Sequence, residues 1–413
     1  MANVSSSNGL EKRPKLRFPG FGEPWKEISL STIFEKSTQK NSDGQITNVI
    51  CNSAKLGLIP QREYFDKDIA NSDNTNGYYI IQQNNFVYNP RKSADAPYGP
   101  ISRYKYEDDG IVSPLYLCFH AKKEIKPLYY EWYFRSSAWH RYIYMSGDSG
   151  ARHDRVSIKD TTFFAMPIKI PSEQEQSKIA TFLEKINTRI EKQTVLVENL
   201  KKYKRGLLRE VFNKSRLTSE YKYNYWKEVK LGEICTYRRG SFPQPYGLPE
   251  WYDEDHGMPF IQVADVNDNM TINLGTNRHI SDTAKNRSVF IPEGTLIVTL
   301  QGTIGRVAIT TYDAYIDRTL LVIQNISDCV LKEFLMYAIY MKFDVEKQTA
   351  DGSIIKTITK ETLTNFSIYL PPMHEQQRIV NLLRSFDRRL ENSVVVLAEL
   401  QEFRSALLQQ LFI

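Results

Sequence analysis

Two stretches of the sequence, 200 residues apart, decide the fold. Residues 170–212 read IPSEQEQSKIATFLEKINTRIEKQTVLVENLKKYKRGLLREVF, and residues 370–412 read LPPMHEQQRIVNLLRSFDRRLENSVVVLAELQEFRSALLQQLF. The two stretches align without a gap. Their matches include Pro171/Pro371, Glu175/Glu375, Gln176/Gln376, Ile179/Ile379, Leu183/Leu383, Arg189/Arg389, Glu191/Glu391, Leu200/Leu400, Leu207/Leu407, Leu208/Leu408 and Phe212/Phe412. This repeat predicts that each half of the chain is one structural unit.

Each stretch is predicted to be a long helix, because proline stands just ahead of it and none lies inside it. Alternating steps of four and three residues select a mostly apolar seam, which is the pattern of a coiled coil. The predicted seam residues are Ile179, Leu183, Ile186, Ile190, Val197, Leu200, Leu207 and Val211, then Ile379, Leu383, Phe386, Leu390, Leu397, Leu400, Leu407 and Leu411.

The alternative is two unrelated amphipathic helices, each buried against its own domain. Polar residues interrupt both seams at the same places, Gln193/Ser393 and Lys204/Arg404. This coincidence favours one shared interface. A tandem repeat joined through a long helix packs most simply as an antiparallel pair with pseudo-two-fold symmetry.

A second repeated motif opens each half, where Trp25-Lys26-Glu27 resembles Trp226-Lys227-Glu228. The segments between these motifs and the helices contain short β-branched runs separated by Gly, Pro, Asn and Asp, with helical patterns at 126–137 and 331–342. We therefore predict an α+β protein with two pseudo-two-fold-related domains separated by the two long antiparallel coiled-coil helices. The predicted divisions are a flexible tail at 1–20, a first domain at 21–171, a first helix at 172–214, a second domain at 215–371 and a second helix at 372–413.

Composition excludes several classes of protein. The chain has 413 residues, a formal net charge of +6 and only four cysteines, which are too scattered for a Cys-x-x-Cys pair. The six histidines show no His-x-x-x-His spacing, so no metal site is expected. The first twenty residues lack the apolar stretch of a signal peptide, and no run approaches the ~18 apolar residues of a membrane span. We expect a cytoplasmic protein without a membrane partner.

With these motifs in this order, the chain resembles the specificity subunit of type I restriction–modification enzymes. The resemblance covers nearly all of residues 18–413 and rests on the Pro-x-x-x-Glu-Gln helix starts, the Leu-Leu-x-x-x-Phe helix ends and the Trp-Lys openings. Further family-like segments are Phe86-Val87-Tyr88-Asn89, 110–116, Pro259-Phe260-Ile261, Pro292-Glu293-Gly294 and 302–306. Each is weak alone, but the duplicated set is specific.

The resemblance implies that each globular segment is a target recognition domain reading one half of a bipartite, asymmetric sequence in double-stranded DNA. It also implies that the helices bind two methyltransferase (M) subunits and that restriction/motor (R) subunits join the complex. The complex would methylate adenine with S-adenosylmethionine and use ATP and Mg²⁺ on its other subunits, while this subunit binds no cofactor and is not catalytic. Two domains on a rigid spacer would address major-groove segments roughly 34 Å apart.

The sequence agrees with a non-catalytic role. It has no Asn-Pro-Pro-aromatic motif of adenine methyltransferases and no Walker A loop, since Gly302 and Gly305 are followed by Arg306. The segment Gly302–Gly305 is predicted to be a tight turn between strands at 296–300 and 307–310, although a phosphate cradle is the alternative. Two other hypotheses are a coiled-coil interaction scaffold without DNA readout and an autonomous enzyme.

Charge alone does not locate the DNA-binding surface. Residues 215–371 carry 16 basic and 19 acidic residues, so any DNA-binding face there must be a local cluster. Lys201, Lys202, Lys204 and Arg205 either follow the phosphate backbone or form the solvated flank of the coil. The candidate DNA contacts are Arg91, Lys92, Tyr98, Arg103, Lys105, Arg141, Arg152 and Arg155 in the first domain, and Arg238, Arg239, Arg278, Lys285, Arg287, Gln301, Thr303, Arg306 and Lys356 in the second.

Overall fold

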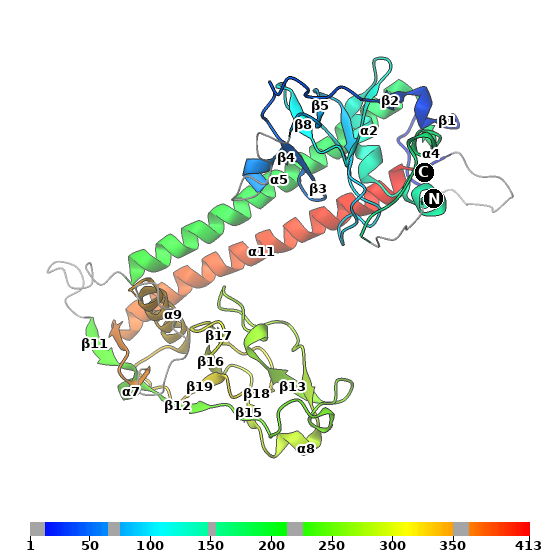
Figure 1. Ribbon diagram of the computed structural model, residues 1–413. Coiled ribbons are helices and arrows are strands. Elements are labelled where there is room, and N and C mark those ends of the chain that lie inside the picture. The colour runs from blue at the N-terminus through cyan, green and yellow to red at the C-terminus, as the bar shows by residue number, and fades with distance from the viewer. Residues whose placement is uncertain (1–12, 65–74, 148–153, 213–225, 350–362) are drawn as a thin grey trace. The chain divides into compact units, whose positions relative to one another are not determined.

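The computed structural model describes residues 13–64, 75–147, 154–212, 226–349 and 363–413 (Figure 1). The chain divides into two compact units. The first contains residues 1–194 and 395–413, and the second contains residues 195–394. Each unit therefore holds one globular domain and a part of both long helices.

The first domain is built on a four-stranded antiparallel sheet in the order β2-β9-β6-β7. Its strands are β2 (Phe34–Lys36), β9 (Leu117–Ala121), β6 (Phe86–Tyr88) and β7 (Ile101–Arg103), and helix α2 (Pro127–Arg135) packs against β7. Aromatic side chains fill the space between sheet and helix. Their core includes Phe34, Phe86, Phe119 and Phe134 in mutual ring contact.

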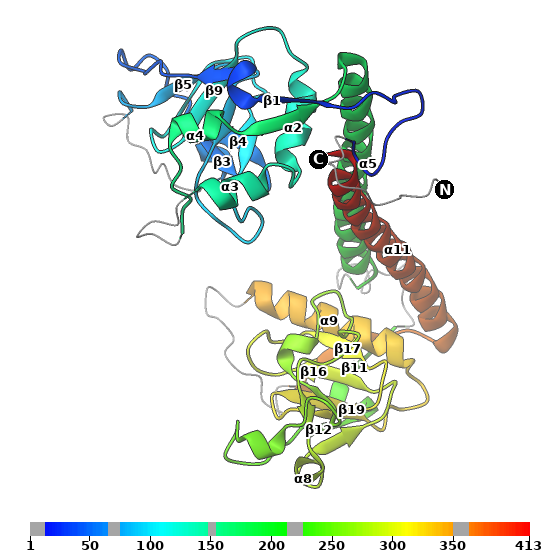
Figure 2. The same cartoon turned by 90° about the vertical axis from the view of Figure 1, so that its right-hand side faces the viewer.

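The second domain has the same sheet with the same strand order, β12-β19-β16-β17, again antiparallel throughout. The strands are β12 (Thr236–Arg239), β19 (Leu320–Gln324), β16 (Leu296–Thr299) and β17 (Val307–Ile309), and helix α9 (Lys332–Thr349) lies against β17 (Figure 2). The sequences of the two halves resemble each other only at the start of each domain and in the long helices. The shared strand order shows that the domains between them are also structurally duplicated.

A second antiparallel pair is also shared between the domains. In the first domain β5 (Tyr79–Ile81) pairs with β8 (Gly110–Val112), and in the second β15 (Val289–Ile291) pairs with β18 (Ala314–Ile316). In chain order these two strands enclose β6 and β7 in the first domain, and β16 and β17 in the second. The shared frame is therefore at least six strands and one helix.

The domains differ in the segment inserted after the first sheet strand. In the first domain this insert contains the hairpin β3 (Ile50–Ser53) and β4 (Gly57–Pro60) with the short helix α1 (Gln61–Tyr64). In the second domain it spans 240–288 and contains η3 (Pro249–Trp251), β13 (Met258–Ile261), η4 (Val263–Asp265), β14 (His279–Ile280) and α8 (Asp282–Lys285). Strand β13 also pairs in parallel with β18.

A two-stranded ribbon joins the beginning of each domain to its end. Strand β1 (Lys26–Ser29) pairs with β10 (Pro167–Ile170), and β11 (Lys227–Lys230) pairs with β20 (Ser367–Leu370), in the same antiparallel register. Short helices complete the frame, and they are η1 (Leu30–Thr32), α3 (His140–Ser146), α4 (Asp160–Phe164) and α7 (Leu231–Ile234). The tryptophans that open the two halves, Trp25 and Trp226, are both buried.

The repeated stretches form the 39-residue helices α5 (Glu173–Val211) and α11 (Met373–Leu411). In the first unit the start of α5 and the end of α11 share one core with the domain, and in the second unit the start of α11 meets the end of α5. The helices are therefore antiparallel. The repeated glutamines tie the first turn of each helix to the preceding proline, because Gln176 donates to the carbonyl of Pro171 at 3.0 Å and Gln376 to that of Pro371 at 2.9 Å.

The residues of the predicted seam are buried to different degrees. None of its residues is exposed, yet a subset is only half-buried, namely Ile186, Leu207, Val211, Phe386, Leu390, Leu397 and Leu400. Near the end of α5 the core position shifts by one residue, since Leu208 is fully buried. Such a drift is expected where a helix of 3.6 residues per turn leaves the coil to enter a domain core.

The polar break Lys204/Arg404 forms an interhelical contact in both units. In the second unit Lys204 forms an ion pair with Asp387, which also accepts a 2.6 Å hydrogen bond from Tyr337. In the first unit the equivalent residue, Arg404, donates to Asn187 at 2.7 Å. Lys204 is only 6% exposed, so it is neither a phosphate contact nor part of a solvated flank. Matched polar pairs inside an apolar seam fix its register.

Part of the predicted flexible tail contacts the helices. The backbone amide of Leu16 donates to Gln410 at 3.0 Å, and Arg17 forms two 2.8 Å bonds to the buried carboxylate of Glu175. Phe18 packs edge-on against Phe182. Residues 13–20 therefore lie along α5 and α11, and the rest of the predicted tail lies outside the described residues.

We predict that Asp387→Ala destabilises the second unit by about 2 kcal/mol. Loss of one partner of a buried ion pair typically costs ~3–5 kcal/mol, and the 33% exposure of the Asp387 side chain reduces that cost. Urea denaturation of the purified chain measures the change. Asp387→Asn is the matched control, because it reproduces the amide that the first unit uses at Asn187 and should lose less. Equal losses in both variants would contradict a role for the ion pair.

We also predict that Leu200→Asp combined with Leu400→Asp separates the two helices and abolishes assembly with a methyltransferase partner. Leu200 is 8% exposed, and an unpaired carboxylate in that position lacks any compensating partner. Circular dichroism and co-purification measure the two effects. Leu382→Asp places the same charge on an exposed position of α11 and should leave the helices paired. Retained assembly in the double variant would count against a shared seam.

Candidate nucleic-acid interface

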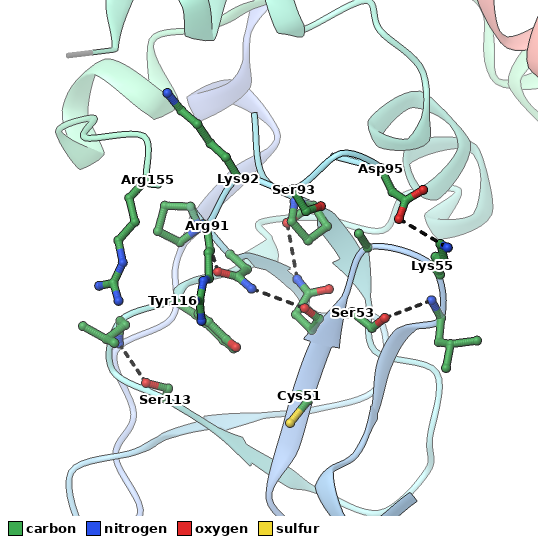
Figure 3. Close-up of a pocket in the computed structure, with 17 residues that line it drawn as sticks. Cys51, Ser53, Lys55, Arg91, Lys92, Ser93, Asp95, Ser113, Tyr116 and Arg155 are labelled. Carbon is green, nitrogen blue, oxygen red and sulfur yellow. Dashed lines mark hydrogen bonds and ion pairs between the residues drawn. The ribbon is translucent and has the colours of Figure 1, made fainter. Parts of the chain in front are cut away.

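The strongest group of predicted cations surrounds a concave surface of about 740 Å³ in the first domain (Figure 3). Arg91 and Lys92 come from the loop between β6 and β7, and Arg155 comes from the segment before α4. Lys55, at the tip of the β3–β4 hairpin, lines the same surface. Four cations on one concavity form a natural contact for a polyanion.

Backbone hydrogen bonds bring these distant residues together. Lys92 donates its amide to the carbonyl of Asp154 at 2.8 Å, and Val156 donates to Pro90 at 2.9 Å. This bridge places Arg91 opposite Arg155. Asp154 only partly balances the two arginines, at 3.9 and 3.7 Å, and its side chain is exposed, so these ion pairs are weak.

A second cation cluster is organised around one buried acid. Glu131 on α2 is 2% exposed and forms ion pairs with Arg103 and Lys105 at 2.8 Å and with Arg135 at 2.9 Å. Burial alone would raise the pKa of Glu131, but the three cations outweigh this and hold it below its usual value. The group carries a formal surplus of two positive charges. These cations also line a cavity of about 270 Å³ beside β4.

The remaining candidates of the first domain do not join these clusters. Tyr98 packs on His140 and Tyr144, and its carbonyl accepts a 2.8 Å bond from Tyr88, so it supports the loop. Arg141 is exposed on α3. Arg152 lies outside the described residues.

In the second domain the structure gathers arginines from three separate segments. Arg239 ends β12 and pairs in register with Leu321, which places it next to the turn that carries Arg318. The hydroxyl of Ser241 donates to the carbonyl of Arg287 at 2.9 Å, which brings the third arginine alongside. Within the described part of the chain none of these arginines has an acidic partner. They form a local basic surface on a domain whose net charge is negative.

Aromatic rings support two of these arginines. Arg318 lies 5.5 Å from the ring centre of Tyr246, and Arg287 lies 5.7 Å from that of Trp251. Both rings belong to an aromatic layer in the insert, where Phe242 contacts Tyr246 and Phe260. A guanidinium held over a ring keeps its donors free and loses less side-chain freedom on binding.

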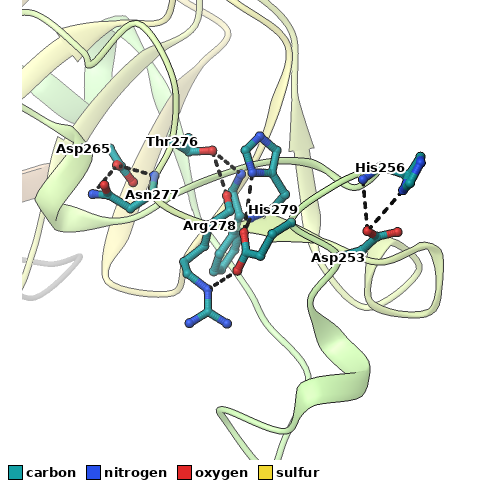
Figure 4. A network of polar contacts seen from close by, with 9 residues as sticks. Asp253, His256, Asp265, Thr276, Asn277, Arg278 and His279 are labelled. Atoms are coloured by element: carbon teal, nitrogen blue, oxygen red, sulfur yellow. Dashed lines mark hydrogen bonds and ion pairs between the residues drawn. The ribbon is translucent and has the colours of Figure 1, made fainter.

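Two predicted cations of the second domain are already paired. Arg278 lies 3.7 Å from the ring centre of Tyr252 and forms a 2.7 Å ion pair with Glu254, within the polar network of Figure 4. Lys285 pairs with Asp282 at 2.5 Å, and this contact raises the pKa of the lysine. Both residues therefore carry little uncompensated charge toward a partner.

The segment Gly302–Gly305 is the predicted turn between β16 and β17. Both glycines adopt positive φ, and a side chain at Gly305 would collide with Phe343. Arg306 does not reach outward, because its guanidinium donates to the carbonyl of Val266 at 2.8 Å. Gln301 and Thr303 remain on the turn, where Thr303 accepts a bond from Thr299. Arg238 is exposed on β12, and Lys356 lies outside the described residues.

Sequence reasoning missed Lys55, Arg135 and Arg318. Each is a single cation without a basic neighbour in the sequence, so no local charge pattern indicates it. It also missed Asn52, a buried amide that ties the hairpin to the sheet. Only the fold brings these residues to the same surfaces.

Among the residues that the structure describes, no cluster of three or more histidine, cysteine or carboxylate side chains could hold a metal ion. No helix in that part of the chain combines the length and hydrophobicity of a membrane span.

Comparison with known proteins accounts for the duplicated frame. The family described as "Type I restriction modification DNA specificity domain" matches residues 22–199 and again residues 223–401. The chain belongs to this family. The resemblance found in the sequence is therefore confirmed, and each half of the chain is one specificity domain.

Individual relatives agree with this assignment. The chain is 25% identical over 252 residues to a putative type I restriction enzyme MjaX specificity subunit from Methanocaldococcus jannaschii, covering 58% of this chain and 56% of that protein. The match thus spans little more than half of that relative's length.

Solved structures show the same fold. The S subunit of a type I restriction-modification system from M. genitalium has a TM-score of 0.55 at 14% identity, covering 97% of this chain and 99% of that one. A chain from a study of complex assembly and conformational transition in the type I R-M system has a TM-score of 0.62 at 18% identity, covering 96% and 99%. The HsdS subunit from Thermoanaerobacter tengcongensis has a TM-score of 0.50 at 20% identity, covering 98% and 99%.

We predict that Glu131→Gln destabilises the first unit at pH 7 by about 2 kcal/mol, because three cations lose their buried counter-charge. The folded pKa of Glu131 lies below the usual value of a glutamate, so its stabilisation is complete above that usual pKa and is lost as the pH falls through the folded pKa. The variant should therefore approach the wild type in acid. Chemical denaturation at pH 7 and below pH 4 measures this, and a pH-independent difference would contradict it.

Proposed function

We propose that this chain is the DNA-reading subunit of a type I restriction–modification complex. Each specificity domain would read one half of a bipartite, asymmetric sequence in double-stranded DNA. The observation that carries the proposal is a shared six-stranded frame with different inserts at the same position, β3–β4 in one domain and 240–288 in the other. A common frame with unlike inserts suits two readers of different half-sites.

The charge distribution supports this proposal. The first domain has two clusters with surplus positive charge, and the second, which is net acidic, has three arginines without an acidic partner among its described residues. Local cations of this kind can hold phosphates, and arginine favours the guanine edge in the major groove. If the whole surface were basic, DNA could bind on any face, whereas local clusters restrict binding to the faces that carry them.

The proposed complex contains two M subunits bound to the helices and R subunits that join for restriction. Adenine methylation with S-adenosylmethionine, and ATP- and Mg²⁺-dependent restriction, would take place on those subunits in the cytoplasm. This chain would contribute no catalytic residue and bind no cofactor. Its contribution would be to position the DNA, because the methyltransferase acts where the specificity domains hold the target sequence.

A second candidate function is an interaction scaffold that assembles partners through the coiled coil without reading DNA. The exposed apolar residues Val394, Val395 and Val396 on α11 favour a protein partner on the helices in either case. Gel-shift assays with the methyltransferase partner separate the two functions, because a scaffold shows no preference among DNA sequences.

We predict that exchanging residues 215–369 for those of another family member changes one half of the methylated sequence and leaves the other half as it was. The frame that holds each insert is shared, so an exchanged domain should fold on the same helices. Sequencing of modified adenines in DNA from cells that carry the complex measures the result.

The matched control exchanges residues 21–171, which should change the opposite half-site. An unchanged methylated sequence after both exchanges would exclude DNA readout by these domains. A lone chain incubated with DNA and S-adenosylmethionine should give no methylation, and activity there would instead favour an autonomous enzyme.

A further inference from the structure

The β3–β4 hairpin of the first domain stands between two cationic surfaces. Its tip, Ala54-Lys55-Leu56, is exposed, and the side chain of Leu56 is 63% exposed. Leu56 lines the cavity that holds Arg91, Lys92 and Arg155, and it also lines the cavity that holds Arg103, Lys105 and Arg135. The tip is thus flanked on both sides by cations.

The base of the hairpin is held firmly. The buried side chain of Asn52 donates to the carbonyl of Val87 at 2.8 Å and accepts a 2.7 Å bond from Ser102. Its backbone carbonyl accepts a bond from Asn89 at 3.3 Å. These contacts fix β3 to the neighbouring strands β6 and β7, so the exposed tip projects from a rigid base.

The cations around the tip form two separate groups, one on each side of the hairpin, so they suit a partner that presents two rows of negative charge. On one side Arg91, Lys92, Arg155 and Lys55 are accompanied by two acids, Asp154 and Asp95, and on the other side Arg103, Lys105 and Arg135 share Glu131. Each side therefore keeps a surplus of two positive charges. Lys55 itself is held 3.5 Å from Asp95 by an exposed and hence weak ion pair, so it can exchange that partner (Figure 3).

The DNA major groove matches this arrangement. It is wide enough for a two-stranded β-ribbon, and a row of phosphates follows each of its edges. A hairpin inside the groove would bring its tip to the base edges while cations on both sides meet the two phosphate rows. Lysine pairs with guanine acceptors, and an apolar side chain packs on the thymine methyl group.

We propose that the β3–β4 hairpin enters the major groove and is the sequence-reading element of the first domain. Lys55 and Leu56 contact base edges, and the two cation clusters hold the phosphate backbones on either side. This proposal rests on the proposed function, and it identifies which part of the domain reads the half-site. The insert at the same position of the second domain has a different fold, as expected if this position carries the specificity.

The experiment uses the full chain assembled with its methyltransferase partner. Sequencing of modified adenines first gives the methylated sequence, and salt-dependent filter binding then uses three duplexes: that sequence, the same sequence with the first domain's half-site altered, and an unrelated sequence. The domain exchange above shows which half-site belongs to the first domain. The variants are Lys55→Ala with Leu56→Ala, Arg91→Ala with Lys92→Ala, and Lys122→Ala as a control cation on the same domain outside both cavities.

The tip variant should lose tenfold or more of its discrimination between the correct and the altered half-site, while binding to the unrelated duplex is unchanged. The Arg91/Lys92 variant should weaken binding to all three duplexes alike and lower the slope of log affinity against log salt by about 2. The Lys122 variant should behave as the wild type.

Full discrimination by the tip variant would overturn the proposal. So would an equal loss on all three duplexes with the tip variant, because that result assigns the tip to phosphate binding or folding. Either outcome leaves the proposed function intact if the wild-type complex methylates a bipartite sequence and the domain exchange alters one half. Absence of a defined methylated sequence in the wild type would instead refute the proposed function itself.

Discussion

The structure depends on the burial of each long helix end in the core at the start of the other helix. In the first unit Leu411 and Phe412 pack with Tyr129 and with Leu183 of α5, and in the second Leu208 joins the core that contains Leu383. Neither domain core is complete without residues from the other half of the chain. This exchange makes each unit depend on residues from both halves of the chain, and burial of the exchanged helix end stabilises that unit.

Burial alone does not determine how the helices align, because an apolar seam tolerates a shift by one heptad. The matched pairs Lys204–Asp387 and Arg404–Asn187 remove that freedom, since a shift would leave a cation in the seam without its partner. The two pairs occupy equivalent positions of the repeat but use different chemistry. Both repeats therefore place a polar pair at the position that sets the register of the helices. The paired side chains differ, because one repeat uses lysine and aspartate and the other uses arginine and asparagine.

The sequence predicts the helices well because their constraint is periodic and is repeated twice. It also predicts individual strands such as β6 and β16, since a short run of apolar residues that forms a fully buried strand is a local pattern. It does not reveal that both domains share one strand order, because Phe86 and Leu296 meet the same burial requirement with unrelated residues. The burial of Lys204 also escapes prediction, because its partner Asp387 is 183 residues away in the chain.

The proposed DNA-binding residues also divide into those that a local sequence pattern indicates and those that only the fold brings together. Arg91 and Lys92 stand out because they are adjacent in the sequence, whereas Arg318 becomes significant only when β12 and the insert bring Arg239 and Arg287 beside it. Net charge carries little information at this scale, because an exposed cation is screened within ~8–10 Å at physiological salt. What matters for a phosphate is the number of uncompensated cations within that distance. A domain with an excess of acids can therefore bind DNA, provided that its acids pair elsewhere, as Glu254 does with Arg278.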